Sequence, residues 1–471
     1  MATKKDLVEA YSFSRRRLVT AFVSGAPGGR EVEPARPGRS VVGGLALSVL
    51  LIAGAAIAGI FTGRPEIDWS QPGMFLSKER GALYVVLPDS DSELRPVINV
   101  TSAQLILGAE VTPEIVAQDE IEQQHVGDDI GILGAPADVP SADSLVPSGW
   151  TACTSHGKGI AVEIGGSSTV TPVPRGAFTV SVGDDTYVIA QSRSSATEET
   201  GAYVYAVPGD QAQRDRVLSS LALPNTSAAM AVPEAWVGLF PRGEAFTLEP
   251  FGIGDFGAAV EGPGLPEGAE QGDWFRLDDE DEGGFVLTEL GPAPLSGFEF
   301  TLYRALAQDK AAELTVSEMS MSQGEIDLDA TRWPDHQLVP PSDELCGQLV
   351  AEEGAPPRIL LATDPEGAVS AVASAAKPND VSPTVEDGFG AYVHSAAWDA
   401  GDGGLPFLLT SKPSRHELVG SGVATQLGYD DVESPVVPDT WIELFPDGVP
   451  LSIDAALCPP SASTVTGSSC S

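Results

Sequence analysis

The chain has 471 residues, 42% of them hydrophobic, so it is long enough for several structural units to bury their own cores. Its 67 acidic residues outnumber 26 basic ones, which gives a formal net charge of −41 at pH 7. A surface this acidic repels phosphate groups and argues against a nucleic-acid partner, while it suits a soluble domain.

The charge is distributed unevenly along the chain. Residues 1–40 carry eight basic and four acidic side chains, whereas the remainder carries 18 and 63. Residues 41–61 are uncharged and as a helix would span ~31 Å, close to a hydrocarbon core of ~30 Å. We therefore predict a single transmembrane helix with a cytoplasmic N-terminus and an extracytoplasmic C-terminal part. The alternative is a signal peptide cleaved near Ala56-Ile57-Ala58, but signal sequences have shorter charged and apolar segments.

Residues 3–23 are predicted to form an amphipathic helix before the span. Thr3 and Asp6 have capping-box spacing, and one face carries Leu7, Tyr11, Leu18 and Phe22. Arg15, Arg16 and Arg17 suit a helix that lies on an anionic membrane surface or packs on a cytoplasmic partner. The alternative is a short tail whose arginines only set the topology. Gly- and Pro-rich residues 25–39 are predicted to form a flexible link.

Two distant segments have related sequences. Residues 232–249 (VPEAWVGLFPRGEAFTLE) and 437–454 (VPDTWIELFPDGVPLSID) share seven of eighteen residues without gaps. A proline at the helix start, a Trp-x-x-Leu-Phe stripe and a Pro-x-Gly stop predict a short helix that ends in a turn.

A second repeated pattern is a β-strand followed by a helix. The predicted strands are Tyr84–Leu87, Tyr187–Ala190, Phe285–Thr288 and Phe407–Thr410. The predicted helices are Ser102–Leu107, Val217–Leu223 and Val423–Leu427, with a less clear counterpart at Phe298–Leu306. The spacing is too irregular for a solenoid, so we expect four discrete modules around another structural element.

All four cysteines follow the predicted span, in an oxidising compartment where disulfides persist. Cys153 and Cys346 lie outside the repeats, and a bond between them would close a loop of almost two hundred residues. The chain-entropy model assigns such a loop at most about 5 kcal/mol. Cys458 and Cys470 are candidates for a second, local bond.

Several segments of the chain resemble the EccB family, which consists of membrane components of the type VII (ESX) secretion system of actinobacteria. They are Tyr11–Leu18 with the following span, Leu94–Gly108, Ile130–Pro136, Trp150–Cys153, Leu427–Tyr429, and Val437–Pro438 with Leu444–Asp454. The resemblance covers essentially the whole chain in the family's order.

The resemblance implies a cell (inner) membrane pore complex that also contains an FtsK/SpoIIIE-type ATPase and a polytopic membrane subunit. It implies self-association of the extracytoplasmic parts, and four repeats around a β-rich central domain whose disulfide joins Cys153 to Cys346. Cys458 and Cys470 depart from the family pattern.

The sequence offers little for catalysis or cofactor binding. A phosphate-binding loop needs Gly, four residues, then Gly-Lys-Ser/Thr, whereas Gly157-Lys158 has Ala152 and Gly159 at the two ends. We therefore predict a turn there and no cofactor, although some family members are labelled ATPases. The histidines, His125, His156, His336, His394 and His416, show no metal-ligand spacing.

One acidic stretch has the spacing of a calcium loop. Asp278, Glu280, Glu282 and Glu289 occupy positions one, three, five and twelve, with Gly283 at position six. Glutamates are long for positions three and five, and Phe285–Thr288 is predicted to be a strand. An acidic hairpin turn is therefore the preferred interpretation.

Together these observations predict an α+β protein: a cytoplasmic amphipathic helix, one transmembrane helix, and four small α/β repeats around a β-rich, disulfide-linked central domain. We expect the repeats at 62–125, 181–250, 251–315 and 386–457, the central domain at 126–180 and 316–385, and flanking segments at 1–40, 41–61 and 458–471. The predicted function is a structural subunit of a type VII secretion complex that forms the extracytoplasmic part of its export channel. Alternatives are a free-standing membrane-tethered envelope or wall-binding protein and, less favoured, an ATP-hydrolysing subunit.

Overall fold

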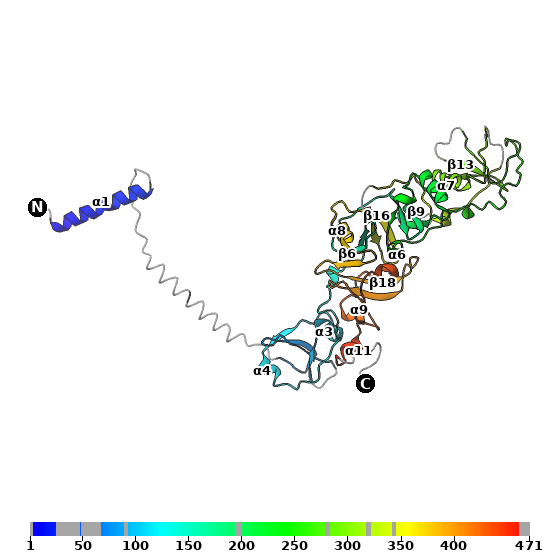
Figure 1. Ribbon diagram of the computed structural model, residues 1–471. Helices are drawn as coiled ribbons and strands as arrows, with labels where there is room; N and C mark the ends of the chain where they lie inside the picture. The colour runs from blue at the N-terminus through cyan, green and yellow to red at the C-terminus, as the bar shows by residue number, and fades with distance from the viewer. Residues whose placement is uncertain are drawn as a thin grey trace. The chain divides into compact units, whose positions relative to one another are not determined.

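The computed structural model describes residues 3–24, 48, 67–88, 93–193, 200–277, 283–316, 322–341 and 345–460. It contains two compact bodies, one ending at Asp68 and the other beginning at Trp69. The first contains helix α1 (Lys4–Ser24), which confirms the predicted N-terminal helix (Figure 1). Thr3 and Asp6 start it as the capping spacing predicts, because the Thr3 backbone N–H donates to the Asp6 carboxylate at 2.9 Å.

The predicted transmembrane segment, residues 41–61, lies outside the described residues except for Ser48. Within the described ranges, no helix combines the length and the apolar character that a membrane crossing requires. The span therefore stays a prediction.

Module 1 is the first of four small sheets that each carry a helix. Its elements are β1 (Gly73–Ser77), β2 (Leu83–Val86), β3 (Leu94–Val97), α3 (Val100–Leu107), β4 (Glu114–Val116) and α4 (Gln118–Ile121). The strand order is β3-β2-β1-β4, and β4 returns parallel to β1. Asn99 caps α3 by accepting from the Ser102 N–H, and Gly108 ends the helix at a φ of 97° that favours glycine.

Modules 2 and 4 repeat this connectivity. Module 2 consists of β8 (Ala177–Val182), β9 (Asp185–Arg193), β10 (Thr200–Ala206), α5 (Gln211–Ser220), β11 (Met230–Ala231) and α6 (Glu234–Val237). Module 4 consists of β18 (Ala391–Ala396), β19 (Leu405–Leu409), β20 (Arg415–Glu417), α9 (Val423–Gln426), β21 (Val436–Pro438), α10 (Asp439–Ile442) and α11 (Ile453–Ala456). In each module the last strand again lies parallel to the first.

Module 3 is a reduced copy of the same arrangement. It contains β12 (Trp274–Phe275), β13 (Gly284–Thr288), β14 (Gly291–Leu295) and α7 (Gly297–Ala307). Its fourth strand is reduced to a single parallel bridge between Trp274 and Glu313. Each predicted strand is the second strand of its module: β2, β9, β13 and β19. The helix that the sequence predicted less clearly at 298–306 is α7. Each predicted strand is therefore followed by a helix in the structure. The helix predicted at Val217–Leu223 is displaced, however, because α5 ends at Ser220 and Ala222 has a positive φ that a helix does not allow.

A six-stranded central sheet is assembled from two distant parts of the chain. Its strands are β5 (Thr151–Thr154), β6 (Ile160–Ile164), β7 (Thr171–Pro172), β15 (Leu345–Val350), β16 (Arg358–Thr363) and β17 (Val381–Val385), in the order β17-β6-β5-β15-β16-β7. Helix α8 (Ala368–Ala375) packs on β5 and β6. Short 3₁₀ turns occur at η1 (Ala142–Ser144), η2 (Thr226–Ala228), η3 (Glu249–Phe251) and η4 (Asp329–Thr331).

The disulfide between Cys153 and Cys346 joins β5 to β15 at the centre of this sheet. The two residues are paired opposite each other in the antiparallel register, and both are fully buried. The predicted bond is therefore confirmed, and it fixes the register of two strands that lie 193 residues apart in sequence.

The buried cores connect the modules in an order that differs from the sequence. One core combines the central sheet with modules 2 and 4, a second combines modules 2 and 3, and a third combines modules 1 and 4. Helix α3 contacts α9 and α11 (Figure 1). Helix α5 contacts α7. Packing therefore places the modules in the order 1, 4, 2, 3. Modules 1 and 4 share one core, modules 4 and 2 share a core with the central sheet, and modules 2 and 3 share another.

The disulfide gives a direct test of this arrangement. Replacing both Cys153 and Cys346 with alanine should lower the free energy of unfolding by about 2–4 kcal/mol, because the unfolded chain regains the freedom of a very long loop. Urea unfolding of the purified chain under non-reducing conditions measures the change, with non-reduced wild type as the reference. An unchanged unfolding midpoint in the double variant would show that the bond does not brace the fold.

Candidate functional site

The related segments form a buried seam between modules 2 and 4. Trp236 of α6 and Trp441 of α10 are both 0% exposed and belong to the same core. The Trp441 indole Nε1 donates to the Leu239 carbonyl oxygen at 3.0 Å, across 202 residues of sequence. The predicted short helix in each segment is confirmed. Pro233 and Pro438 were predicted at the first helical position but are the N-cap residues, one position before it.

The Pro-x-Gly ending of each segment has a steric cause. After each of these helices the chain turns and runs beside the third strand of the same module. In module 2 Arg242 forms a β-bridge with Val204, and in module 4 Asp447 forms one with Arg415. A Cβ atom at Gly243 would overlap the Tyr205 ring, and one at Gly448 would overlap the His416 ring. Only glycine allows this close approach of backbone to ring.

The joint between modules 1 and 4 contains an acidic cavity of about 870 Å³. It lies beside Gly108, which caps α3, and Gly428, which follows the C-cap of α9, and the segment 142–147 completes its wall. Its lining among the described residues includes no lysine or arginine but five carboxylates: Glu110, Asp143, Asp430, Asp431 and Glu433. The joint therefore concentrates negative charge between two modules.

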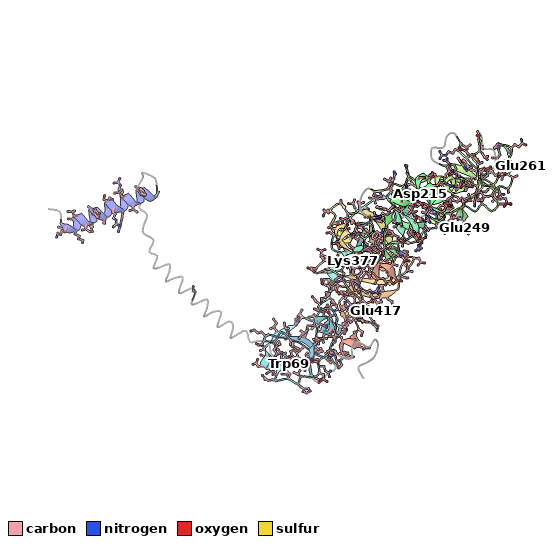
Figure 2. All side chains as sticks on the ribbon, viewed as in Figure 1. Trp69, Asp215, Glu249, Glu261, Lys377 and Glu417 are labelled. Carbon is pink, nitrogen blue, oxygen red and sulfur yellow. A yellow bond between two sulfur atoms is a disulfide. The ribbon has the colours of Figure 1, made fainter. Side chains whose placement is uncertain are left out.

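The corresponding joint between modules 2 and 3 is built differently. There the Arg216 guanidinium of α5 lies 2.8 Å from the Asp309 carboxylate, just beyond the end of α7. Opposite charges therefore meet at the joint between modules 2 and 3, whereas the charged residues that line the cavity between modules 1 and 4 are all acidic. Acidic side chains elsewhere are spread over modules 2, 3 and 4, as the labelled Asp215, Glu249, Glu261 and Glu417 show (Figure 2).

His416 lies beside a second cavity, of about 360 Å³, between the same two modules. The cavity is bounded by residues 134–136 on the module 1 side and by β20 and residues 447–449 of module 4. His416 is 3% exposed; Nδ1 lies 2.8 Å from the Val449 carbonyl oxygen and Nε2 lies 3.0 Å from the Ser414 hydroxyl. Burial lowers the pKa of His416, and the bond to Val449 opposes part of that change. A neutral ring that donates from Nδ1 and accepts at Nε2 satisfies both contacts.

The structure places the nucleotide-binding candidate in a tight turn. Gly157-Lys158 lies between the antiparallel strands β5 and β6, and the Lys158 N–H closes the turn on the Ser155 carbonyl. A phosphate-binding loop instead connects a strand to a helix. The prediction of a turn after Cys153 is confirmed.

The calcium-loop candidate falls partly outside the described residues, because Asp278, Glu280 and Glu282 are not described. Gly283 precedes β13 and Glu289 follows it, so an extended strand separates positions that a calcium loop would bring together. No group of three metal-ligating side chains occurs in the described part of the chain. Phe285–Thr288 is a strand, as predicted.

The remaining predicted residues lie at separate places. Arg15, Arg16 and Arg17 are exposed on α1. Cys458 follows α11 and is not a free thiol, but Cys470 lies outside the described residues, so their bond stays a prediction. The sequence analysis missed the acidic cavity and the Arg216–Asp309 pair, because their members are brought together only by packing between modules.

Residues 1–462 match the family described as type VII secretion system ESX-1, transport TM domain B. A stretch of 120 residues is 37% identical to the ESX-1 secretion system ATPase EccB1 of Mycolicibacterium smegmatis, covering 26% of this chain and 24% of that protein. The EccB1 protein of Mycobacterium tuberculosis is 27% identical over 289 residues, covering 58% of this chain and 55% of that protein. These matches therefore span between about a quarter and a half of each relative.

Two solved structures share the fold. The EccB3 dimer from the ESX-3 core complex contains a chain with a TM-score of 0.62 and 21% identity, covering 82% of this chain and 99% of that chain. An intact ESX-5 inner membrane complex contains a chain with a TM-score of 0.59 and 20% identity, and the match covers 97% of this chain and 95% of that chain. At such identities the likeness concerns the fold alone.

The environment of His416 predicts a pH dependence of stability. Its pKa is lowered in the folded state, so the unfolded state binds the proton more readily. The associated stability is fully present above the unfolded pKa of about 6.5 and is lost as the pH falls through the folded value. Unfolding between pH 8 and pH 5 should therefore show a steeper loss for wild type than for His416→Gln. His125→Gln, at an exposed histidine, is the matched control and should behave as wild type; equal slopes for all three proteins would contradict the assignment.

Proposed function

Because this chain belongs to the family described as type VII secretion system ESX-1, transport TM domain B, we propose that it is a structural, membrane-anchored subunit of a type VII secretion complex. In this role its C-terminal body forms part of the extracytoplasmic side of a protein-export channel. The match over residues 1–462 carries the proposal, since it includes both the predicted cytoplasmic segment and all four modules.

The chemistry of the chain supports this placement. The buried Cys153–Cys346 bond suits an oxidising compartment, and both cysteines follow the uncharged segment 41–61. That segment is the proposed single-pass anchor. On its cytoplasmic side α1 presents Arg15, Arg16 and Arg17, which favour both this topology and contact with anionic lipid.

The proposed partners are other membrane subunits of the machine, including an FtsK/SpoIIIE-type ATPase and a polytopic subunit. Small residues in the anchor, Gly43, Gly44, Gly54, Ala55 and Ala58, allow close packing against neighbouring helices. Self-association is also proposed, in keeping with the EccB3 dimer from the ESX-3 core complex, which shares the fold. The modules would supply the protein contacts outside the membrane.

The proposed role is one of assembly. The names of the relatives include the term ATPase, yet Gly157-Lys158 closes a hairpin turn and lacks the flanking residues that cradle phosphates. The Trp236–Trp441 seam and the Arg216–Asp309 pair instead join modules to one another. We assign ATP hydrolysis in the complex to the proposed FtsK/SpoIIIE-type partner.

Purification from native membranes tests the assembly. A C-terminal affinity tag on the full chain, extracted in mild detergent, should retain a membrane ATPase and a polytopic subunit that mass spectrometry identifies. A matched chain with residues 41–61 replaced by an unrelated membrane helix should retain fewer of these subunits. Recovery of the wild-type chain alone, as a monomer, would instead indicate a free-standing envelope protein.

The topology is tested separately with two tags on one chain. In spheroplasts a membrane-impermeant protease should remove a C-terminal tag and leave an N-terminal tag intact, because only the part after residue 61 is exposed outside. Detergent lysis should make both tags accessible. Protection of the C-terminal tag in intact spheroplasts would contradict the proposed orientation.

A further inference from the structure

Two equivalent segments meet at the seam between modules 2 and 4, and only one of the two equivalent hydrogen bonds that they could form is present. The two segments are copies of one another, so Trp236 corresponds to Trp441 and Leu239 corresponds to Leu444. The bond from Trp441 Nε1 to the Leu239 carbonyl oxygen is present at 3.0 Å. Its counterpart, from Trp236 Nε1 to the Leu444 carbonyl oxygen, is not made.

The donor of the missing bond is buried without a partner, and the residue that would accept it is also buried. Trp236 is 0% exposed and its Nε1 has no acceptor in the described part of the chain. Leu444 is 5% exposed, and no donor among the described residues reaches its carbonyl oxygen. Buried polar groups are nearly always paired, because an unpaired one keeps its desolvation cost without compensation.

The two segments lie in contact at this seam. A Cβ atom at Gly238, just after α6, would lie 3.8 Å from Thr440 Cγ2 of α10, and the Thr440 hydroxyl is also buried without a partner. The surrounding contacts are apolar, including Trp236 with Phe240 at 5.6 Å and Trp150 with Phe445 at 6.0 Å between ring centroids. Apolar contacts are not directional and tolerate sliding better than hydrogen bonds do.

From this arrangement we infer that the seam is a two-position joint. In the position described here Trp441 donates to Leu239; in the second position Trp236 donates to Leu444, with α6 displaced along α10. One indole-to-carbonyl bond replaces another of the same kind, so the two positions differ little in hydrogen-bond energy. The exchange changes how α6 of module 2 sits against α10 of module 4, within the core that both share with the central sheet.

A double-mutant comparison separates this joint from a seam with one position. The variants are Trp236→Phe, Trp441→Phe and both together in the full chain, with Trp333→Phe as control because its Nε1 also donates to a carbonyl, that of Glu244, at 2.8 Å, but in a different core. In a two-position joint each single variant keeps one bond, so the double variant should lower the melting temperature by more than the sum of the singles, with an excess of about 1–2 °C. Pairing Trp333→Phe with Trp236→Phe should give additive changes.

Additive changes in the double variant would overturn the inference, and so would a less-than-additive effect. Fluorine NMR of the chain labelled with 5-fluorotryptophan gives an independent measurement, with the Trp236 signal assigned by its loss in Trp236→Phe. Removing the competing indole with Trp441→Phe should shift and sharpen the Trp236 signal, because only the second position then offers a bond. An unchanged Trp236 signal in Trp441→Phe would also overturn the inference.

Discussion

The antiparallel pairing of β5 with β15 is the constraint on which the rest of the structure depends. These strands come from segments 193 residues apart, and the buried Cys153–Cys346 bond joins them at directly opposed positions. A one-residue slip in register would turn every side chain of β15 to the other face. The covalent bond excludes such a slip, so the sheet offers one defined surface for the modules that pack on it.

This pairing also divides the modules into two groups. Modules 2 and 3 lie in the loop that the disulfide closes, whereas modules 1 and 4 lie outside it. The groups meet through the central sheet and through the related segments of α6 and α10. The two peripheral joints differ in charge: Arg216 meets Asp309 between modules 2 and 3, while five carboxylates surround the cavity between modules 1 and 4. Copies of one small fold are thus combined into joints with different physical properties.

The sequence predicted the local elements better than their assembly. The four second strands were predictable because runs such as Tyr187–Ala190 are apolar, β-forming and bounded by polar turns. Strands such as β12, with two residues, are too short to leave a pattern. The repeated Trp-x-x-Leu-Phe motif predicted two similar short helices, but similarity between copies does not say that the copies face each other. The acidic cavity was beyond prediction because Glu110 and Asp431 are more than three hundred positions apart and meet only through packing of α3 against α9.

Hydrogen exchange of the full chain, compared between wild type and the variant with Cys153→Ala and Cys346→Ala, tests the central claim most directly. If β5–β15 pairing holds the modules on one frame, loss of the bond should raise exchange together in β5, β6, β15 and β16 and in the packed helices α6 and α10, because these elements share one core. Modules 1 and 3, at the far ends of the packing order, should change least. Loss of protection confined to the immediate neighbours of the two cysteines, with α6 and α10 unaffected, would contradict the account.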